Sequence, residues 1–342
     1  MAKIAINGFG RIGRLFFRQA FGRKGLDIVA INDLGDIENL AYLLKYDSVY
    51  RTYDKEVASD KENGLLIVDG KKIKVLQEKE LAKLPWKDLK IDVAVESTGA
   101  FESFEKASVH VTAAGAKRVV ISAPAKDADG VAGGRTILLG VNEEDFKTCK
   151  VSSNGSCTTN ATHPVVAVLS ENPGIAKAFL ATVHGYTATQ NLVDGPTKGQ
   201  DYRRGRAAAV NISPSFTGAA ISVTRPLPEL AGKFDGLAYR VPIATGSLAD
   251  ITFVTKRKTS AEEINKILTD AANSERWKGI LEVTNDQIVS SDIIGMPQAA
   301  LVDLQYTKVI DGDLVKVLSW YDNEWGYVTT LVEHVIKAAA TL

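Results

Sequence analysis

In the first half of the chain, short apolar and β-branched runs alternate with longer stretches whose apolar positions recur at helical spacing. The stretch Ile12–Arg23 predicts a helix whose apolar side chains pack on a sheet, and Phe101–Ala114 predicts another. This alternation predicts a mostly parallel, doubly wound sheet. The buried strands expected in it are Lys3–Asn7, Ile28–Asn32, Val93–Ser97, Val119–Ser122 and Ile137–Leu139.

After about residue 150 the strand-like runs become longer and more alternating, and loops rich in Gly, Pro and Arg separate them. This pattern predicts a mixed or antiparallel sheet with helices on one side, followed by a final helix over Tyr327–Ala340. The fold class predicted from these patterns is α/β. Two domains are expected, because 342 residues exceed what one hydrophobic core usually serves. The strands expected here are Ala178–Val183, Ala238–Val241, Asp250–Thr255 and Leu314–Trp320.

A GxGxxG motif, formed by Gly8, Gly10 and Gly13, follows the first predicted strand and opens the first predicted helix. Glycine permits the tight turn, the approach of the backbone to a pyrophosphate, and close helix–strand packing. Asp33 ends the second predicted strand, where a carboxylate can bind the ribose hydroxyls of a dinucleotide. Asp33 could instead be an ordinary helix cap, but the βαβ context favours the cofactor role. NAD is expected, because the carboxylate repels the extra phosphate of NADP and no Arg follows it directly.

Cys157 lies in a segment of small polar residues, Ser153–Asn160, that precedes an apolar helical pattern with Pro164 placed in its first turn. A cysteine near a helix N-terminus is favoured as the thiolate, and a neighbouring histidine lowers its pKa further. The alternative is a buried small hydrophobe, and we expect Cys149 to be either that or a surface residue. From the residue types alone, the catalytic and buried readings of Cys157 stay equally open.

A general base for this cysteine should be one of the four histidines. His184 ends a predicted strand and leads into a hydroxyl-rich loop, so it is the best candidate. His110, His163 and His334 all fall within predicted helices.

The charge balance argues for no particular class of macromolecular partner. Forty-one basic residues cancel forty-one acidic ones, so neither a nucleic acid nor a membrane surface is indicated. The N-terminus does not resemble a signal peptide, and no apolar run approaches the roughly 20 residues needed to span a bilayer. Two cysteines outside any CxxC pair indicate neither a disulfide framework nor a metal site. We therefore expect a cytoplasmic enzyme with reduced thiols.

Seven motifs occur in order from Lys3 to the C-terminal helix: INGFGRIGR, SNGSCTTN, HGYTATQ, VDGPT, SFTGAA, YRVP and SWYDNEWGY. Over essentially its whole length, the chain thus resembles the bacterial-type, NAD-dependent, phosphorylating glyceraldehyde-3-phosphate dehydrogenases. The resemblance implies a Rossmann-type NAD-binding domain at residues 1–156, completed by a C-terminal helix at 325–342. It implies an α+β catalytic domain with a large mixed, mostly antiparallel sheet at residues 157–324. The arginine-rich loop 202–206 resembles one that reaches a neighbouring subunit's cofactor, which implies a homotetramer.

The resemblance also implies the chemistry of glycolytic aldehyde oxidation. Cys157 would attack the aldehyde, His184 would act as base, and phosphate would cleave the resulting thioester to release bisphosphoglycerate. The residues implied in NAD binding are Gly8, Gly10, Arg11, Ile12, Gly13, Asp33, Leu34, Thr98, Ser122, Asn323 and Tyr327. Those implied in binding the substrate phosphate are Thr187, Thr189 and Arg240. Those implied for the attacking phosphate are Ser156, Thr158, Thr217 and Gly218.

The sequence departs from the family pattern in four places. Ala161 replaces a second cysteine, Phe216 replaces a small hydroxyl residue, residues 241–247 differ from the usual VPTPNVS, and Asp127–Arg135 is a longer, Gly-rich excursion. Phe216 and the segment after Arg240 therefore leave room for a close relative that oxidises erythrose-4-phosphate and uses water instead of phosphate. A non-catalytic NAD-binding protein on the same scaffold is disfavoured, since the cysteine, histidine and arginine of the site are all present.

Overall fold

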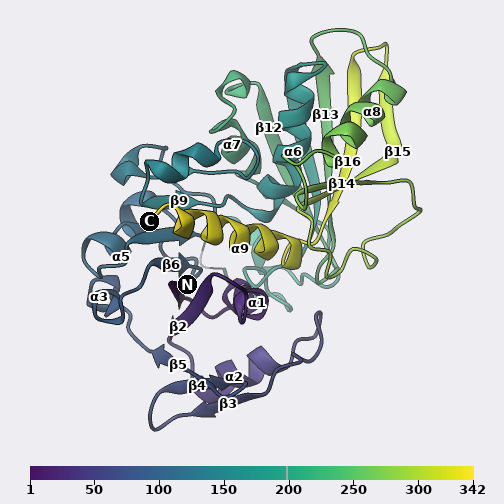
Figure 1. Cartoon of the computed structure of the whole chain (residues 1–342). Helices are drawn as coiled ribbons and strands as arrows, with labels where there is room; N and C mark the ends of the chain where they lie inside the picture. The colour runs from purple at the N-terminus through teal and green to yellow at the C-terminus, as the bar shows by residue number, and fades with distance from the viewer. Residues whose placement is uncertain (198) are drawn as a thin grey trace. The chain divides into compact units, whose positions relative to one another are not determined.

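The computed structural model describes residues 1–197 and 199–342, which divide into two compact units (Figure 1). The first unit comprises Met1–Gly155 and Val328–Leu342, and the second comprises Ser156–Tyr327.

The first unit is built on a nine-stranded sheet with the order β3-β4-β5-β2-β1-β6-β7-β9-β8. All neighbouring pairs from β5 to β8 are parallel, and only β3-β4 and β4-β5 are antiparallel. The predicted mostly parallel sheet is thus confirmed. Its strands are β1 (Ala2–Asn7), β2 (Leu26–Asn32), β3 (Val57–Asp60), β4 (Leu65–Val68), β5 (Lys71–Leu76), β6 (Val93–Glu96), β7 (Arg118–Ile121), β8 (Arg135–Thr136) and β9 (Val151–Ser153).

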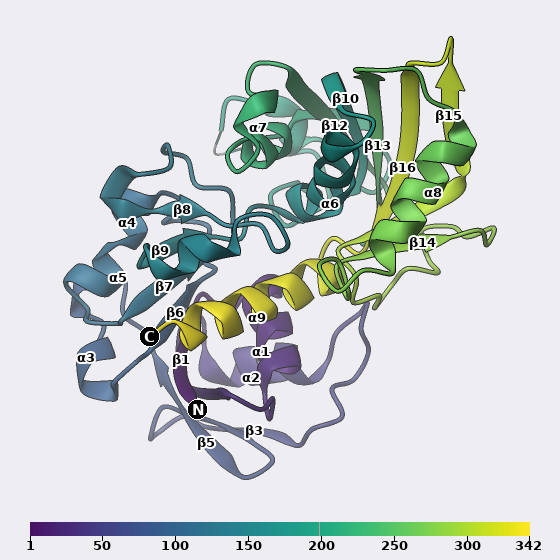
Figure 2. The ribbon, with the colours of Figure 1, turned by 45° about the horizontal axis from the view of Figure 1, so that its top comes forward.

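The helices of this unit follow the βαβ pattern. Buried Leu15, Phe16 and Phe17 give α1 an apolar side that packs in the core. Figure 2 shows α3, α4 and α5 gathered beside β6 and β7, where Phe104 and Trp86 join the hydrophobic core. The helices are α1 (Arg11–Ala20), α2 (Ile37–Lys45), α3 (Trp86–Leu89), α4 (Phe104–Ala107), α5 (Val109–Thr112) and the part of α9 (Trp325–Ala340) that begins at Val328.

Two predicted elements of this unit are wrong. The single helix over Phe101–Ala114 is two one-turn helices with Ser108 between them, where the backbone stays helical but the Ser108 hydroxyl donates to the Glu105 carbonyl at 2.7 Å. The strand predicted at Ile137–Leu139 does not form, and β8 ends one residue before it. The Asn142 side chain accepts from the N–H of Leu138 and donates to the Thr136 carbonyl, which turns the chain away from the ladder. Burial of Ile137 and Leu139 explains why their apolar pattern resembled that of a strand.

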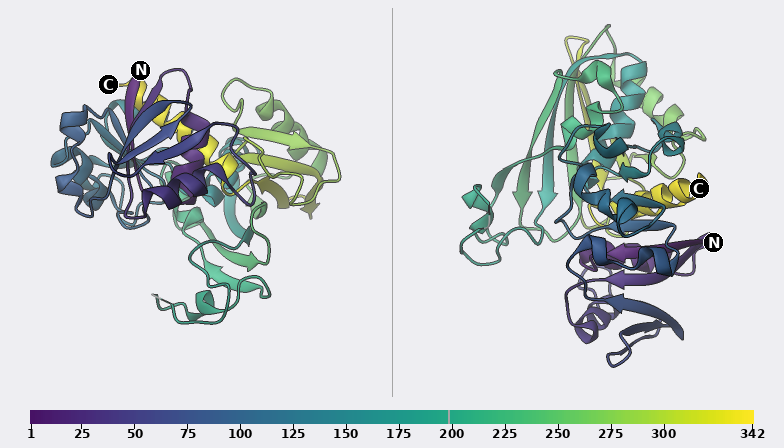
Figure 3. Two further views of the ribbon diagram at one scale, coloured as in Figure 1. Left: turned by 90° about the horizontal axis from the view of Figure 1, so that it is seen from below. Right: turned by 90° about the vertical axis from the view of Figure 1, so that its left-hand side faces the viewer.

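The second unit is built on a seven-stranded sheet with the order β11-β12-β10-β13-β16-β15-β14. Only β10-β12 and β14-β15 pair in parallel, so the sheet is mixed and mostly antiparallel, as predicted. The right panel of Figure 3 shows the helices of this unit gathered on one face of the sheet. Its elements are β10 (Ile175–Gly185), β11 (Ser213–Phe216), β12 (Phe234–Val241), β13 (Ser247–Thr255), β14 (Leu281–Thr284), β15 (Ala300–Ile310), β16 (Leu314–Tyr321), α6 (Cys157–Glu171), α7 (Ala219–Thr224) and α8 (Ala261–Ala272).

Helix α6 runs through the core of the second unit and has almost no exposed face, since all of its residues from Thr158 to Leu169 are buried. Pro164 lies well inside this helix, so the prediction that it occupies the first turn is wrong. The helix begins seven residues earlier, because Ser156 caps it and supplies a stronger start signal than the proline does.

No helix of the described part of the chain is long and apolar enough to cross a membrane.

Candidate active site

Cys157 is the first residue of α6, which confirms that it lies at a helix N-terminus. The cap is reciprocal: the Ser156 side chain accepts from the N–H of Thr159 at 3.0 Å, and the Thr159 hydroxyl accepts from the N–H of Ser156 at 3.1 Å. The capping box fixes the backbone on which the thiol is carried. The Cys157 side chain stays partly accessible, whereas Cys149 is buried at 3% exposure.

His184 faces this thiol from the end of β10, and its Nε2 lies 3.3 Å from the Cys157 sulfur. The other ring nitrogen, Nδ1, lies 2.7 Å from the Gly185 carbonyl oxygen. In the tautomer with its proton on Nδ1, that proton is donated to this carbonyl and Nε2 can accept the thiol proton, whereas the guanidinium of Arg240, which can only donate, suits the opposite tautomer. The structure thus places the predicted base within hydrogen-bonding distance of the predicted nucleophile. This proximity could not be derived from the sequence alone.

Arg240 borders the histidine on the side away from the thiol. It lies on β12, where it is the direct partner of His184 in the parallel ladder between β10 and β12. Its Nη1 lies 2.8 Å from Nδ1 of His184 and donates to the Gly185 carbonyl at 3.1 Å. A fixed positive charge is therefore built into the site, where it can bind an anionic substrate group.

The electrostatics of the pair differ from the prediction. Burial raises the pKa of the Cys157 thiol, although the Arg240 charge and hydrogen bonds from Thr158 oppose that effect. Burial and the charge of Arg240 lower the pKa of His184 to about 3. The expected lowering of the thiol pKa is thus reversed, because desolvation outweighs the helix N-terminus. A neutral imidazole beside a thiol is the arrangement of a general base that acts as the thiol attacks.

The predicted substrate-phosphate ligands Thr187 and Thr189 lie together, with their hydroxyl oxygens 3.1 Å apart. Arg204 joins them: its Nη1 donates to the Thr189 hydroxyl at 2.7 Å, and its Nη2 donates to Ser215 at 3.0 Å. In the sequence, Arg204 appears only as a member of the arginine-rich loop 202–206. No local pattern pairs it with a threonine fifteen residues earlier, so only the folded chain shows it as a candidate anion ligand.

The residues predicted for the attacking phosphate are more dispersed. Ser156 caps α6, and the hydroxyl of buried Thr158 contacts the Tyr321 hydroxyl at 2.9 Å. Thr217 and Gly218 lie at the start of α7, where the Thr217 hydroxyl accepts from the N–H of Ala219. Within the described residues, no hydrogen bond joins Thr217 or Gly218 to the thiol or the imidazole.

Tyr321 is a second residue that the sequence did not single out. Its buried hydroxyl bridges Thr158 at 2.9 Å and Thr182 at 2.7 Å, and its ring meets the His184 ring edge-on at 6.0 Å. It thereby ties the first turn of α6 to β10 beneath the cysteine and the histidine. The SWYDNEWGY motif contains it, but its hydroxyl partners come from two other elements.

The first unit contains a cavity of about 1080 Å³ at the carboxyl ends of its parallel strands. Its wall includes Gly8, Gly10, Asp33, Leu34 and Thr98 of the predicted NAD ligands. This is the edge where open α/β sheets bind nucleotides. Arg11, Ile12, Gly13 and Ser122 are not part of the wall.

The three motif glycines act differently in this wall. Gly8 adopts φ +93°, and a Cβ there would meet the Thr98 nitrogen at 2.6 Å. A Cβ on Gly13 would meet the Gly8 carbonyl oxygen at 2.1 Å, so this glycine allows the close packing of α1. A Cβ on Gly10 would meet nothing within 4 Å, which leaves its backbone open to a ligand. These features fit a dinucleotide pyrophosphate.

Asp33 is not the helix cap that the sequence offered as the alternative, because Asp36 caps α2 by accepting from the N–H of Asn39. The Asp33 carboxylate accepts from the N–H of Phe9 at 2.6 Å and from the N–H of Gly35 at 2.8 Å, which fixes it beside the glycine turn. The residue also lines the cavity, so the same carboxylate is available to ribose hydroxyls. Arg11 is held at the start of α1 by Asp47, with 2.6 Å between Nη1 and Oδ2.

Asn323 and Tyr327 belong to the second unit. The Asn323 carboxamide oxygen accepts from the Ser247 hydroxyl at 2.8 Å and from the N–H of Gly246 at 3.2 Å, which turns its amide nitrogen the other way. Gly246 and Ser247 lie in the segment that departs from the family pattern. The residues of this segment therefore still hydrogen-bond to Asn323. Phe216, another departure, is 72% exposed.

A mostly parallel sheet with a glycine-rich nucleotide cavity is typical of an NAD-dependent dehydrogenase. A cysteine within hydrogen-bonding distance of a histidine is the arrangement expected of one that acts through a thiol. Residues 2–104 match the family described as glyceraldehyde 3-phosphate dehydrogenase, NAD binding domain, and residues 156–323 match its C-terminal domain. The chain belongs to the glyceraldehyde-3-phosphate dehydrogenase family.

Curated relatives agree with this assignment over nearly their full lengths. The glyceraldehyde-3-phosphate dehydrogenase of Borreliella burgdorferi is 49% identical over 337 residues, 97% of this chain and 98% of that protein. Those of Clostridium pasteurianum and Streptomyces coelicolor are 47% and 48% identical and are covered to 97% and 96%, each matching 97% of this chain.

Proposed function

We propose that the chain catalyses the glycolytic oxidation and phosphorylation of glyceraldehyde-3-phosphate with NAD, through a thioester on Cys157. The family supports the overall reaction. The observation that supports the route is the 3.3 Å approach of the Cys157 sulfur to Nε2 of His184 at the N-terminus of α6.

The thiol of Cys157 attacks the aldehyde carbon while Nε2 of His184 accepts the thiol proton. The resulting thiohemiacetal oxygen is stabilised by the imidazolium of His184 and by the N–H of Cys157 at the start of α6. NAD, held in the cavity of the first unit, would supply the acceptor for the hydride that leaves this carbon. Cys157 then holds the acyl group as a thioester. Inorganic phosphate attacks the thioester carbon, the C–S bond breaks to release the acyl phosphate, and the departing Cys157 sulfur regains its proton from His184.

Two anion sites serve this reaction. Thr187, Thr189 and Arg240 hold the substrate phosphate, with Arg204 fixing the Thr189 hydroxyl. Ser156, Thr158, Thr217 and Gly218 receive the attacking phosphate. Hydroxyls and guanidinium groups suit phosphate, because each donates hydrogen bonds to anionic oxygen.

The wider organisation follows the family resemblance. Residues 1–156 with 325–342 form the NAD-binding domain, and residues 157–324 form the catalytic domain. Gly8, Gly10, Arg11, Ile12, Gly13, Asp33, Leu34, Thr98 and Ser122 bind NAD, and Asn323 and Tyr327 hold its nicotinamide end. The enzyme works as a homotetramer in the cytoplasm.

Mass spectrometry of the acylated enzyme tests this route. The full-length protein is mixed with glyceraldehyde-3-phosphate and NAD without phosphate, quenched in acid and digested. The Cys157 peptide should carry a phosphoglyceroyl group that disappears when inorganic phosphate is added before quenching, while the Cys149 peptide stays unmodified. Formation of NADH without any acyl group on Cys157 would refute the route.

A further inference from the structure

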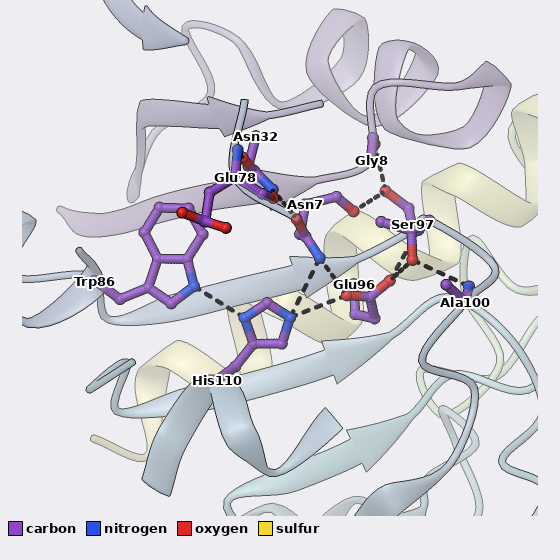
Figure 4. A network of polar contacts seen from close by, with 10 residues as sticks. Asn7, Gly8, Asn32, Glu78, Trp86, Glu96, Ser97, Ala100 and His110 are labelled. Atoms are coloured by element: carbon purple, nitrogen blue, oxygen red, sulfur yellow. Dashed lines mark hydrogen bonds and ion pairs between the residues drawn. The ribbon is translucent and has the colours of Figure 1, made fainter. Parts of the chain in front are cut away.

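Figure 4 shows a chain of buried polar side chains in the first unit, and two of its members, Asn7 and Asn32, line the cavity of that unit. Three of them end adjacent parallel strands at one level: Asn32 on β2, Asn7 on β1 and Glu96 on β6. Nδ2 of Asn32 donates to Oδ1 of Asn7 at 2.7 Å, and Nδ2 of Asn7 donates to Oε2 of Glu96 at 2.6 Å. All three are less than 5% exposed.

Glu96 is the centre of this chain of contacts. Its Oε2 accepts from Asn7 and lies 2.9 Å from Nε2 of His110. Its Oε1 accepts from the N–H of Thr98 at 2.9 Å and from the Thr98 hydroxyl at 2.5 Å. A carboxylate is the side chain that can accept all of these bonds, because both of its oxygens are acceptors.

The contact with Trp86 determines which ring nitrogen of His110 carries the proton. The indole N–H can only donate, and it lies 2.9 Å from Nδ1 of His110. Nδ1 therefore accepts, and the ring proton must lie on Nε2, where it is donated to Glu96. His110 and Trp86 are both fully buried, so water does not compete for these bonds.

The same carboxylate supports the wall of the cavity. Thr98 and Asn7 line the cavity, and both are hydrogen-bonded to Glu96, which is not itself part of the wall. The Thr98 backbone is also the surface against which Gly8 turns, since a Cβ on Gly8 would meet its nitrogen at 2.6 Å. The Ser97 hydroxyl donates to the Gly8 carbonyl at 2.7 Å. A shift of the segment 97–98 would therefore move the glycine turn as well.

We propose that Glu96 is a positioning residue for cofactor binding. His110, in the tautomer that Trp86 selects, donates to the Glu96 carboxylate and holds it in place. Glu96 in turn fixes Thr98 and the glycine turn in the conformation that binds NAD. Glu96 acts through Thr98 and Asn7 and does not touch the ligand. The inference rests on the proposed function in that it takes this cavity as the NAD site.

Replacing Glu96 by glutamine keeps the shape but leaves one acceptor oxygen for donors on both sides. We expect Glu96→Gln to raise the Kd for NAD by about 10-fold or more, the usual cost of unpairing a buried hydrogen bond to a charged group. His110→Leu removes one donor and should raise the Kd by roughly 5- to 10-fold. His110→Gln retains an N–H that can reach Glu96 and should restore binding to within about 2-fold of the native protein.

His334 provides a matched control in the same unit. It is equally buried and hydrogen-bonded, with Ser152 at 2.8 Å and Asn154 at 3.1 Å, but none of these three residues lines the cavity. His334→Leu should lower the melting temperature and leave the Kd for NAD unchanged. A general loss of stability would instead weaken NAD binding in both histidine variants.

The experiment is calorimetric titration of the full-length variants with NAD, together with steady-state kinetics. We expect the KM for NAD to rise in Glu96→Gln and His110→Leu while kcat changes by less than about 2-fold, as when only binding is lost. The double variant that combines Glu96→Gln with His110→Leu should bind NAD no more weakly than Glu96→Gln alone, because both changes act through one carboxylate.

The outcomes separate the two proposals. If the native protein does not bind NAD, the proposed function fails. If the native protein binds NAD and Glu96→Gln binds it equally well, only the positioning role of Glu96 is overturned. If Glu96→Gln does not fold, the pair of His110 variants decides, and an equal Kd for His110→Leu and His110→Gln overturns the inference.

Discussion

The sulfur of Cys157 lies 3.3 Å from Nε2 of His184, although twenty-seven residues separate them in the chain. Two local features produce this approach. A capping box at Ser156 starts α6 at the cysteine, and β10 ends one residue after the histidine. Arg240, the neighbour of His184 in the ladder, places a positive charge on the far side of the ring.

The first prediction compares the two cysteines, Cys157 and Cys149. Cys157→Ser should lower kcat by at least about 10³-fold, because a serine hydroxyl beside a neutral imidazole is a far weaker nucleophile than the thiol. NAD binding should be retained, since the residue lies outside the NAD cavity. Cys149→Ser, at the buried cysteine, should keep near-native turnover. NADH formation followed at about 340 nm measures both, and comparable loss in the two variants would contradict the assignment.

His184→Asn removes the proton acceptor while keeping a polar side chain. A positioned general base contributes roughly 10²- to 10⁴-fold, so kcat should fall within that range. Alkylation of Cys157 by iodoacetamide should slow in parallel, because the thiol loses the group that accepts its proton. Unchanged alkylation in a folded variant would show that the imidazole does not activate the thiol.

Arg204 tests the first anion site. Arg204→Ala removes the donor that lies 2.7 Å from the Thr189 hydroxyl and should raise the KM for glyceraldehyde-3-phosphate by roughly 10-fold, the cost of a lost charged hydrogen bond. The Kd for NAD should not change. Arg257, which pairs with Glu263 elsewhere in the same unit, is the matched control, and Arg257→Ala should leave the KM near its native value. Equal KM values for the two variants would remove Arg204 from the site.

The sequence predicted the architecture well where the signal is local. Strand, glycine turn and helix are contiguous around Gly8, so the motif placed the nucleotide edge of the first sheet correctly. The seven family motifs likewise indicate the chemistry of Cys157 independently of the geometry.

Contacts between distant segments could not be predicted in this way. Arg204 meets Thr189, Tyr321 bridges α6 and β10, and Glu96 receives donors from residues up to 89 positions away, all because of how the chain folds back. Pro164 was misplaced for a related reason. Its position inside α6 is tolerated because tertiary packing of an almost fully buried helix overrides the local preference of proline.

Acid stability gives a prediction with a definite sign. Burial lowers the pKa of His334 to about 3, below the ordinary value of 6.5. Its neutral form is thus retained on folding, so its contribution to stability is complete above pH 6.5 and is lost as the pH falls from 6.5 towards 3. The free energy of unfolding should decline in this window by up to about 1.4 kcal/mol per pH unit for this group. Urea denaturation of native protein and His334→Gln at pH 7 and pH 5 should show a smaller decline in the variant. An equal decline would contradict the assignment of a neutral, buried His334.

Steady-state NADH production from glyceraldehyde-3-phosphate and NAD, with and without inorganic phosphate, tests the central claim most directly. The thioester route predicts sustained turnover only when phosphate is present, and without it no more than about one NADH per Cys157. Equal sustained turnover without phosphate would show that water cleaves the thioester. That result would contradict the phosphorylating reaction and would favour oxidation of erythrose-4-phosphate, with Phe216 and the segment after Arg240 as the features to examine.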